Sequence, residues 1–266
     1  GNGTFSNITE SAGFEISCEK CYIAGALWLD YDLDGYLDIF LSDYNQISPN
    51  KLYRNLGDET FQQINLTVYI ENSNSFSAIP IYANDDMYPD IYIANDFDQF
   101  NQLLINQEGQ GFVEMAVEYG VEDPFDGMGL TTCDFNNDLS LDFFVTNIKE
   151  NSLYTKETSN SSFAYTNYSV EANLYDTDWA WGVTFSDFNH DGFEDFYVAN
   201  GFFNPENDRF FINDSGNNFT YTDFSGNPPL MSKSRSVNSF DYDNDGDLDL
   251  IVTAVSYTHL TLPTRT

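Results

Sequence analysis

A nine-residue acidic segment recurs along the chain at a nearly constant interval. The copies begin at positions 30, 82, 134, 187 and 241, so they are 52, 52, 53 and 54 residues apart. A fixed period of this length is typical of a repeat protein in which each unit is one supersecondary structure. The period therefore predicts about five equivalent structural units.

A second pattern follows each acidic segment in the same order. A short run led by Asn or Asp precedes a turn rich in Gly, Asn and Ser, and a Phe follows the turn. The runs begin at Asn50, Asn101, Asn151 and Asp208, and the Phe residues are Phe5, Phe61, Phe112, Phe163 and Phe219. Each unit is expected to contain four short strands separated by turns. Helical periodicity is almost absent, so the chain is predicted to be all-β.

The strands after the acidic segments are apolar on both faces. Residues 37–41, 195–198 and 248–252 do not alternate, as strands with one solvated face would. Four-stranded sheets stacked face to face around an axis cover both faces and form a β-propeller. A small residue lies five positions before each segment. Small side chains would let the first strands of the blades converge on a central channel, although such residues are also ordinary at the start of a strand. They are Gly25, Ser77, Gly129, Gly182 and Ser236.

Three of the acidic segments share the complete pattern Asp-x-[Asp/Asn]-x-Asp-Gly-x-x-Asp, numbered here as positions 1 to 9. Side chains at positions 1, 3, 5 and 9 and the carbonyl at position 7 supply most of the hard oxygen ligands that Ca²⁺ takes. Mg²⁺ is less suited because it demands strict octahedral geometry, and softer metals find no suitable ligands. The expected ligands are Asp30, Asp32, Asp34, Tyr36, Asp38, Asp187, Asn189, Asp191, Phe193, Asp195, Asp241, Asp243, Asp245, Asp247 and Asp249.

Two copies of the segment are incomplete. Residues 82–90 have lost the acid at position 1 and the Gly, and are expected to bind nothing. Residues 134–142 have Leu139 in place of the Gly, so their occupancy is left open. Their candidate ligands are Asp134, Asn136, Asp138 and Asp142.

Two other interpretations of the segments are weaker. An EF-hand is excluded because its position 12 would fall inside an apolar strand and no helix is expected on either side. Acidic β-turns without metal are the remaining alternative. However, four unpaired carboxylates within nine residues would repel one another.

The charge of the chain limits its partners. It has 9 Lys+Arg and 43 Asp+Glu, a net charge of −34, which repels nucleic acid and anionic lipid surfaces. No apolar run approaches the roughly 20 residues of a membrane span, so no membrane insertion is expected. With 41% hydrophobic residues the chain can bury a core rather than remain disordered. Cations are therefore the expected ligands.

Few residues favour catalysis. His190 lies at position 4 of an acidic segment, where it is expected to face solvent, and His259 lies near the C-terminus. Neither a nucleophile elbow nor a glycine-rich phosphate loop is present, so catalysis within the chain is not expected. Cys18 and Cys21 are expected to form a local disulfide, with free thiols as the alternative, and Cys133 to be a small buried residue.

The repeat pattern stops before the end of the chain. Residues 254–266 carry none of its features and are similar to a translated sequencing adapter. They are expected to be a non-native tail, with an irregular last strand as the alternative. The repeat domain then comprises residues 1–253, and both ends are expected to be cuts in a longer protein.

The repeats resemble the FG-GAP/VCBS family of integrin α-subunits and secreted bacterial proteins. Residues 50–55, 92–96 and 127–130 resemble its cartilage-acidic-protein/UnbV-like branch. The resemblance implies a seven- or eight-bladed β-propeller with calcium in the loops that join the first two strands of blades. It also implies extracellular adhesion or scaffolding. This chain has only about five repeats and lacks the C-terminal module that often follows.

The function expected from the sequence is a calcium-binding extracellular propeller that presents one face to a protein or glycan ligand. The alternative is the propeller of a secreted polysaccharide-degrading enzyme, a lyase or hydrolase. The few basic residues argue against a lyase for acidic sugars. Trp179 and Trp181 can stack on a sugar, although packing within buried strands is the more frequent role of such residues.

Overall fold

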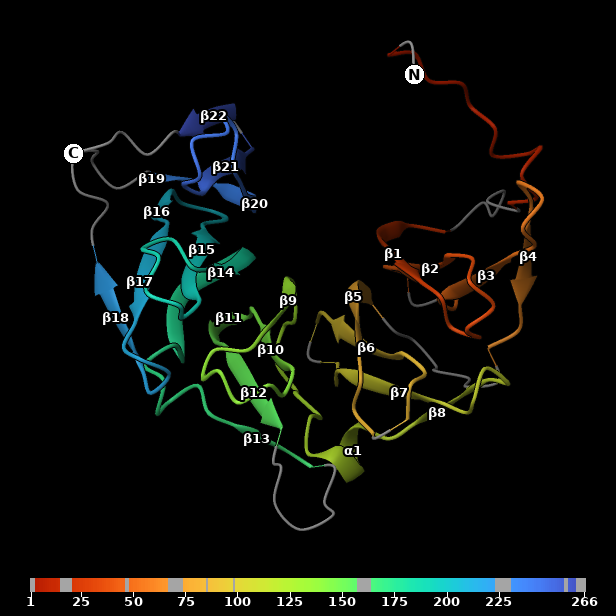
Figure 1. The fold of residues 1–266 in the computed structure, drawn as a ribbon, viewed down its shortest axis with the longest axis horizontal. Helices are drawn as coiled ribbons and strands as arrows, with labels where there is room; N and C mark the ends of the chain where they lie inside the picture. Colours follow the sequence, from red (N-terminus) through yellow and green to blue (C-terminus); the bar gives the residue numbers. More distant parts are fainter. Residues whose placement is uncertain are drawn as a thin grey trace. The chain divides into compact units, whose positions relative to one another are not determined.

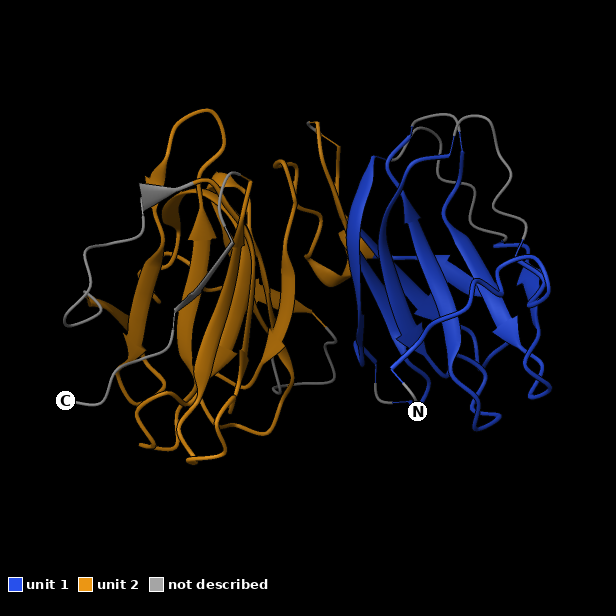
Figure 2. Cartoon of the chain, turned by 90° about the horizontal axis from the view of Figure 1, so that it is seen from above, with its two compact units in different colours: residues 1–93, 102–115 blue, residues 94–101, 116–266 orange. Residues whose placement is uncertain are grey.

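The computed structural model describes residues 3–14, 21–45, 48–66, 74–84, 86–97, 99–156, 164–222, 231–255 and 258–261. Antiparallel sheets dominate this part of the chain, and its one α-helix is the four-residue α1 (Ala116–Tyr119) (Figure 1). No helix there is long and apolar enough to cross a membrane. The chain divides into two compact units, which comprise residues 1–93 with 102–115 and residues 94–101 with 116–266 (Figure 2).

Unit 1 is built on two four-stranded sheets, each with its strands in sequence order. The first contains β1 (Ile23–Leu29), β2 (Asp38–Asp43), β3 (Lys51–Asn55) and β4 (Phe61–Ile64). The second contains β5 (Ser75–Ile81), β6 (Asp90–Asn95), β7 (Gln102–Asn106) and β8 (Phe112–Glu114). Apolar side chains of both sheets, among them Phe40, Leu52 and Ile91, form one buried core.

Unit 2 repeats this plan with additions. The next sheet contains β9 (Leu130–Cys133), β10 (Asp142–Val145), β12 (Ser152–Lys156) and β13 (Tyr165–Asn167). The following one contains β14 (Asp176–Ser186), β15 (Asp195–Asn200), β17 (Arg209–Asn213) and β18 (Phe219–Thr222), with β11 (Ile148–Glu150) on its edge. The last contains β20 (Ser234–Phe240), β21 (Asp249–Ala254) and β22 (Thr258–Thr261). A separate pair joins β16 (Glu206–Asn207) to β19 (Met231–Ser232).

The order of strands expected within a repeat is confirmed. In each sheet an acidic segment joins the first strand to the second, and the second strand is flanked by the first and third. Of the strands expected to be covered on both faces, β15 is buried throughout, whereas Ile39 of β2 and Ile251 of β21 are only partly buried. Strands β6 and β10 are also buried throughout.

Small residues lie where the first strands of neighbouring sheets approach each other. A Cβ on Gly25 would meet the carbonyl oxygen of Phe76 at 3.0 Å, and one on Gly182 would meet the Cα of Ser236 at 2.7 Å. Neither glycine has a positive φ, so close approach rather than a special backbone conformation requires the missing side chain. The convergence expected of first strands is therefore present within each unit.

The residue that leads the third strand also caps the end of the second. Asn50 Oδ1 accepts a hydrogen bond from the backbone N–H of Asp43 at 2.8 Å, and Asp208 Oδ1 accepts one from Asn200 at 2.8 Å. Asn101 and Asn151 make the same contact. These residues are buried, so the cap satisfies a backbone donor that water cannot reach.

Asp208→Asn is expected to remove a pH dependence from stability. Burial raises the pKa of Asp208 to about 6, whereas the unfolded chain releases this proton near pH 4. Because the folded state binds this proton more tightly, protonation of Asp208 stabilises the fold. This contribution is fully present below about pH 4 and is lost as the pH rises through about 6. In calcium-free urea unfolding, wild type should lose ~1.4 kcal/mol relative to Asp208→Asn between about pH 5 and about pH 7.5. A gap that stays constant with pH would contradict this assignment.

Strand β22 lies within the segment expected to be a non-native tail. Its backbone pairs with β21, with Ile251 opposite Leu260. The side chains of β22 and residues 262–266 lie outside the described part of the chain, so the interpretation of this segment stays a prediction. Of the expected Phe positions, Phe61, Phe112 and Phe219 begin strands, Phe5 is exposed, and Phe163 lies outside the described residues.

Candidate metal centre

Four of the five acidic segments adopt the same hydrogen-bonded loop. The carboxylate at position 1 accepts the backbone N–H groups of positions 5 and 6. The Asp30 carboxylate accepts hydrogen bonds from the backbone N–H groups of Asp34 at 3.1 Å and Gly35 at 3.0 Å. The Asp241 carboxylate accepts them from Asp245 and Gly246, both at 3.1 Å. The loops at 134–142 and 187–195 repeat the pattern. The local sequence alone therefore folds each loop around its first acid.

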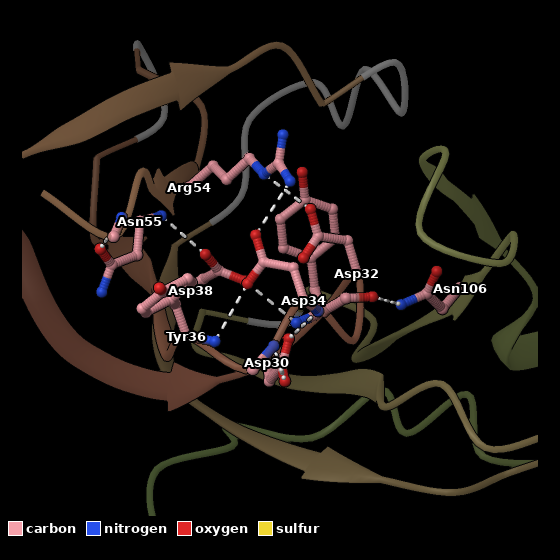
Figure 3. Close-up of polar contacts among 11 residues, drawn as sticks. Asp30, Asp32, Asp34, Tyr36, Asp38, Arg54, Asn55 and Asn106 are labelled. Atoms are coloured by element: carbon pink, nitrogen blue, oxygen red, sulfur yellow. Dashed lines mark hydrogen bonds and ion pairs between the residues drawn. The ribbon is translucent and has the colours of Figure 1, made fainter.

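Two of these loops gather three carboxylates each. Oxygens of Asp30, Asp32 and Asp38 lie within 4.8 Å of one another (Figure 3). Oxygens of Asp241, Asp243 and Asp249 are grouped in the same way. In loop 187–195 the corresponding residues are Asp187, Asn189 and Asp195, in which an amide replaces the second carboxylate.

The acid at position 9 also has a structural role that the sequence analysis missed. Asp38 is fully buried; its Oδ1 accepts Asn55 N at 2.7 Å and its Oδ2 accepts Tyr31 N at 3.1 Å. Asp195 binds the N–H groups of Asn213 and Phe188 in the same way. This residue therefore ties the loop to the end of the third strand, whether or not it also binds a cation.

The carboxylate at position 5 makes a hydrogen bond within each of these loops. It accepts the backbone N–H of position 7, as Asp34 does from Tyr36 and Asp191 does from Phe193. Asp245 accepts the N–H of Asp247 at 3.0 Å. The three-carboxylate groups contain positions 1, 3 and 9, so the ligand role predicted for positions 5 and 7 stays a prediction.

The electrostatics of the loops favour a bound cation. Burial raises the pKa of Asp38 to about 6, and the neighbouring Asp32 and Asp34 add to the rise. Burial raises the pKa of Asp142 to about 8, with Asp138 adding to the effect. Asp32 Oδ1 is buried without a hydrogen-bond partner. A divalent cation among these oxygens would neutralise the repulsion and satisfy that atom.

Loop 30–38 contains its own cation, which the sequence analysis also missed. Arg54 of β3 places Nε 2.7 Å from Asp32 Oδ2 and Nη2 2.9 Å from Asp34 Oδ2 (Figure 3). The corresponding residues of the next three repeats are uncharged: Ile105, Thr155 and Ile212. Arg54 is 40% exposed, so its attraction to the carboxylates is partly screened.

Arg54→Gln is expected to increase the calcium affinity of loop 30–38. The guanidinium and calcium compete for Asp32 and Asp34, so its removal should tighten one site by about threefold to tenfold. Chelator-competition titration of wild type and the variant measures this change. Arg209→Gln, which removes an arginine paired with Asp178, is the matched control and should change no site. An Arg54→Gln protein with unchanged or weaker calcium binding would contradict the competition.

The two incomplete loops behave differently. In loop 134–142, Leu139 has a φ of 66° and its N–H still binds Asp134, so the loop keeps the complete conformation despite an unfavourable residue at position 6. In loop 82–90 the position-1 carboxylate is absent, although Asp86 Oδ1 still accepts Tyr88 N at 2.9 Å and Asp90 keeps its position-9 contacts.

Loops of neighbouring repeats contact each other within each unit. Asn106 Nδ2 donates to Tyr31 O at 2.8 Å in unit 1, and Asn213 Nδ2 donates to Phe135 O at 2.8 Å in unit 2. Both amides also donate to the carbonyl at position 8 of their own loop. His190 is 56% exposed, and its Nε2 lies 3.1 Å from Asp247 Oδ1 of the next loop.

The remaining residues singled out from the sequence have separate environments. Cys133 is buried with a free thiol, as expected. Cys18 lies outside the described residues, so its pairing with Cys21 stays a prediction. Trp179 and Trp181 are half-buried and pack on Phe202, with ring centroids at 4.7 and 5.6 Å.

Comparisons with known proteins identify the repeats. Residues 134–198 and 187–252 match the FG-GAP-like repeat. Each match begins at one acidic loop and ends in the strand after the next loop, so it spans one full period. Residues 134–252 therefore contain FG-GAP-like repeats. No curated protein matches the chain significantly.

A solved lectin structure shares the fold at low sequence identity. A lectin of Agrocybe aegerita, which recognises non-reducing terminal N-acetylglucosamine, is 14% identical with a TM-score of 0.50; the match covers 88% of this chain and 60% of the lectin. The V. cholerae biofilm matrix protein Bap1 is 12% identical with a TM-score of 0.45, over 88% of this chain and 38% of Bap1. The chain thus spans less than two thirds of either protein.

Proposed function

We propose that this chain is a calcium-binding segment of a β-propeller that acts outside the cell as a non-catalytic scaffold for a protein or glycan ligand. The observation that carries the proposal is the loop conformation shared by four repeats, in which the backbone folds around the first acid, and in two of these loops three carboxylates converge. Hard oxygen donors in this number suit calcium. The cartilage-acidic-protein/UnbV-like branch is part of the same proposal.

The residues that would hold calcium are the acids and amides at positions 1, 3, 5 and 9 of loops 30–38, 187–195 and 241–249. We extend the proposal to loop 134–142 because Leu139 does not prevent the shared conformation. When bound, calcium would supply positive charge that offsets the repulsion between the clustered carboxylates.

The proposed extracellular role is supported by the calcium affinity typical of extracellular modules. Extracellular calcium modules commonly have dissociation constants of roughly 10⁻⁴–10⁻³ M, which match calcium levels outside cells rather than in the cytosol. The lectin with a similar fold recognises a terminal sugar, so this fold is compatible with glycan binding. The scarcity of histidine and the use of the acids in loops favour a scaffold over an enzyme.

Equilibrium dialysis against calcium tests the proposal. The account expects four bound ions per chain, with magnesium at equal concentration displacing few of them. Asp86→Ala should not change the number. Three ions would remove loop 134–142 from the proposal, and two or fewer would overturn the calcium function itself.

A further inference from the structure

The fourth repeat departs from the plan of the others at one end. Its first strand, β14, has 11 residues, and its N-terminal part pairs with the additional strand β11. The connection between β15 and β17 contains β16, which pairs with β19. Because the acidic loop follows Ser186 at the other end of β14, these additions lie at the end of the sheet opposite the loop. Departures from a repeat are places where a binding function is expected.

A pocket of about 530 Å³ lies at this end. It is lined by Asp178, Glu206, Asn207, Arg209 and Tyr221, which come from four strands of unit 2. Its volume falls within the roughly 300–1,000 Å³ of small-molecule sites and is far larger than the space a single ion needs.

The charged residues of the pocket are fixed by the protein. Arg209 pairs with Asp178 and donates Nη1 to Asp176 O at 3.2 Å. Glu206 Oε2 accepts the backbone N–H of Trp179 at 3.1 Å. Asp178 has a φ of 72°, a strained conformation that often marks functional sites. The site is therefore preorganised rather than assembled from mobile surface side chains.

The lining offers mainly hydrogen-bond acceptors. Asn207 Oδ1 is buried without a hydrogen-bond partner, and two carboxylates accompany one guanidinium that Asp178 already neutralises. Tyr221 is 44% exposed, and its ring meets Phe211 edge-on at 5.7 Å between centroids. A ligand that fits must therefore supply several donors and an apolar surface for an aromatic ring.

From this arrangement we propose that the pocket binds a neutral saccharide, which deepens the proposed scaffold function and rests on it. The hydroxyl groups of a sugar would donate to Asn207 and Glu206, and the C–H face of its ring would pack on Tyr221. Acidic sugars and phosphates are disfavoured because the carboxylates outnumber the arginine.

Affinity electrophoresis tests this site. The intact chain is run through native gels that contain dextran, galactomannan, xylan or glycol chitin, with alginate as the acidic comparison. At least one neutral polysaccharide should retard wild type more than alginate does. Asn207→Leu and Tyr221→Ala should each weaken the retardation by about tenfold. Tyr22→Ala, which removes a 66% exposed tyrosine of unit 1, is the control and should have no effect.

Each outcome decides the proposal. Absence of retardation in all neutral gels, stronger retardation by alginate, or unaltered retardation of both pocket variants would overturn it. The calcium-dependent melting shift is measured on the same proteins, and it should be unchanged in both pocket variants. If wild type binds no neutral saccharide but keeps its calcium shift, the saccharide site alone is rejected, whereas absence of the calcium shift in wild type would reject the proposed function.

Discussion

Asp90→Ala is expected to lower the free energy of unfolding by about 4 kcal/mol, although its loop is the one that lacks a metal-binding pattern. Asp90 is fully buried, and its two oxygens accept Asn106 N and Ala83 N, both at 2.8 Å. The variant leaves both donors buried without partners, at a cost of roughly 1–3 kcal/mol each. Urea unfolding measures the change, which should be the same with and without calcium.

Asp86→Ala in the same loop is the matched control for this effect. Asp86 is half-buried and bonds Tyr88 N and Asn84 within the loop, so its loss should cost about 1 kcal/mol. Asp90→Asn keeps one acceptor and should lie between the two. If Asp90→Ala unfolds no more easily than Asp86→Ala, the position-9 acid does not connect the loop to the third strand.

The regular part of the fold could be predicted because it is encoded locally. Turn residues and apolar runs recur with the period, so the strand order within each repeat follows from short-range patterns. A neighbouring backbone occupies the space that a side chain would need at Gly25 and Gly182. This steric requirement is visible in the sequence as a small residue at the same position of each repeat. Asp30, Asp32 and Asp38 are likewise close in sequence, and their oxygens lie within 4.8 Å of one another.

Contacts between distant segments could not be predicted in the same way. Arg54 is 20 residues from Asp34, and no local pattern indicates that its guanidinium enters the loop. The hydrogen bonds from the Asn106 and Asn213 side chains to the preceding loop did leave a signal in the sequence. An Asn ends the third strand in three repeats. That signal was interpreted only as part of a strand boundary. Position 9 was similarly interpreted only as a ligand, although its retention as Asp90 in a loop without position 1 indicates a structural role.

The irregular features of the fourth repeat were beyond local patterns altogether. Strands β11, β16 and β19 have two or three residues each, too few to produce a periodic signal. The pairing of Trp179 with Phe202 likewise depends on how the connection after β15 folds.

Calcium is expected to produce the largest change in stability. Binding to the folded state alone stabilises it by about 2.7 kcal/mol per site at a hundredfold excess over the dissociation constant. For a chain of this size that is roughly 5 °C in melting temperature for each saturated site. Saturation of the four loops of the proposal should therefore raise the melting temperature by roughly 20 °C, and a chelator should reverse the change.

Asp245→Ala and Asp86→Ala separate the metal from the hydrogen bonds of the loop. Asp245 accepts Asp247 N and Asp86 accepts Tyr88 N, so both variants lose the same position-5 contact. Of these two loops, 241–249 has carboxylates at positions 1, 3 and 9, whereas loop 82–90 lacks the one at position 1. The difference between the variants in their response to calcium therefore reports the ion.

Differential scanning calorimetry of wild type, Asp245→Ala and Asp86→Ala, each with a chelator and with about 10 mM calcium, is the most direct test that calcium in these loops is structural. The account predicts that calcium raises the melting temperature of wild type and Asp86→Ala equally, and that Asp245→Ala loses about one quarter of the rise. No calcium-dependent shift in wild type, or a shift abolished as fully by Asp86→Ala as by Asp245→Ala, would contradict it.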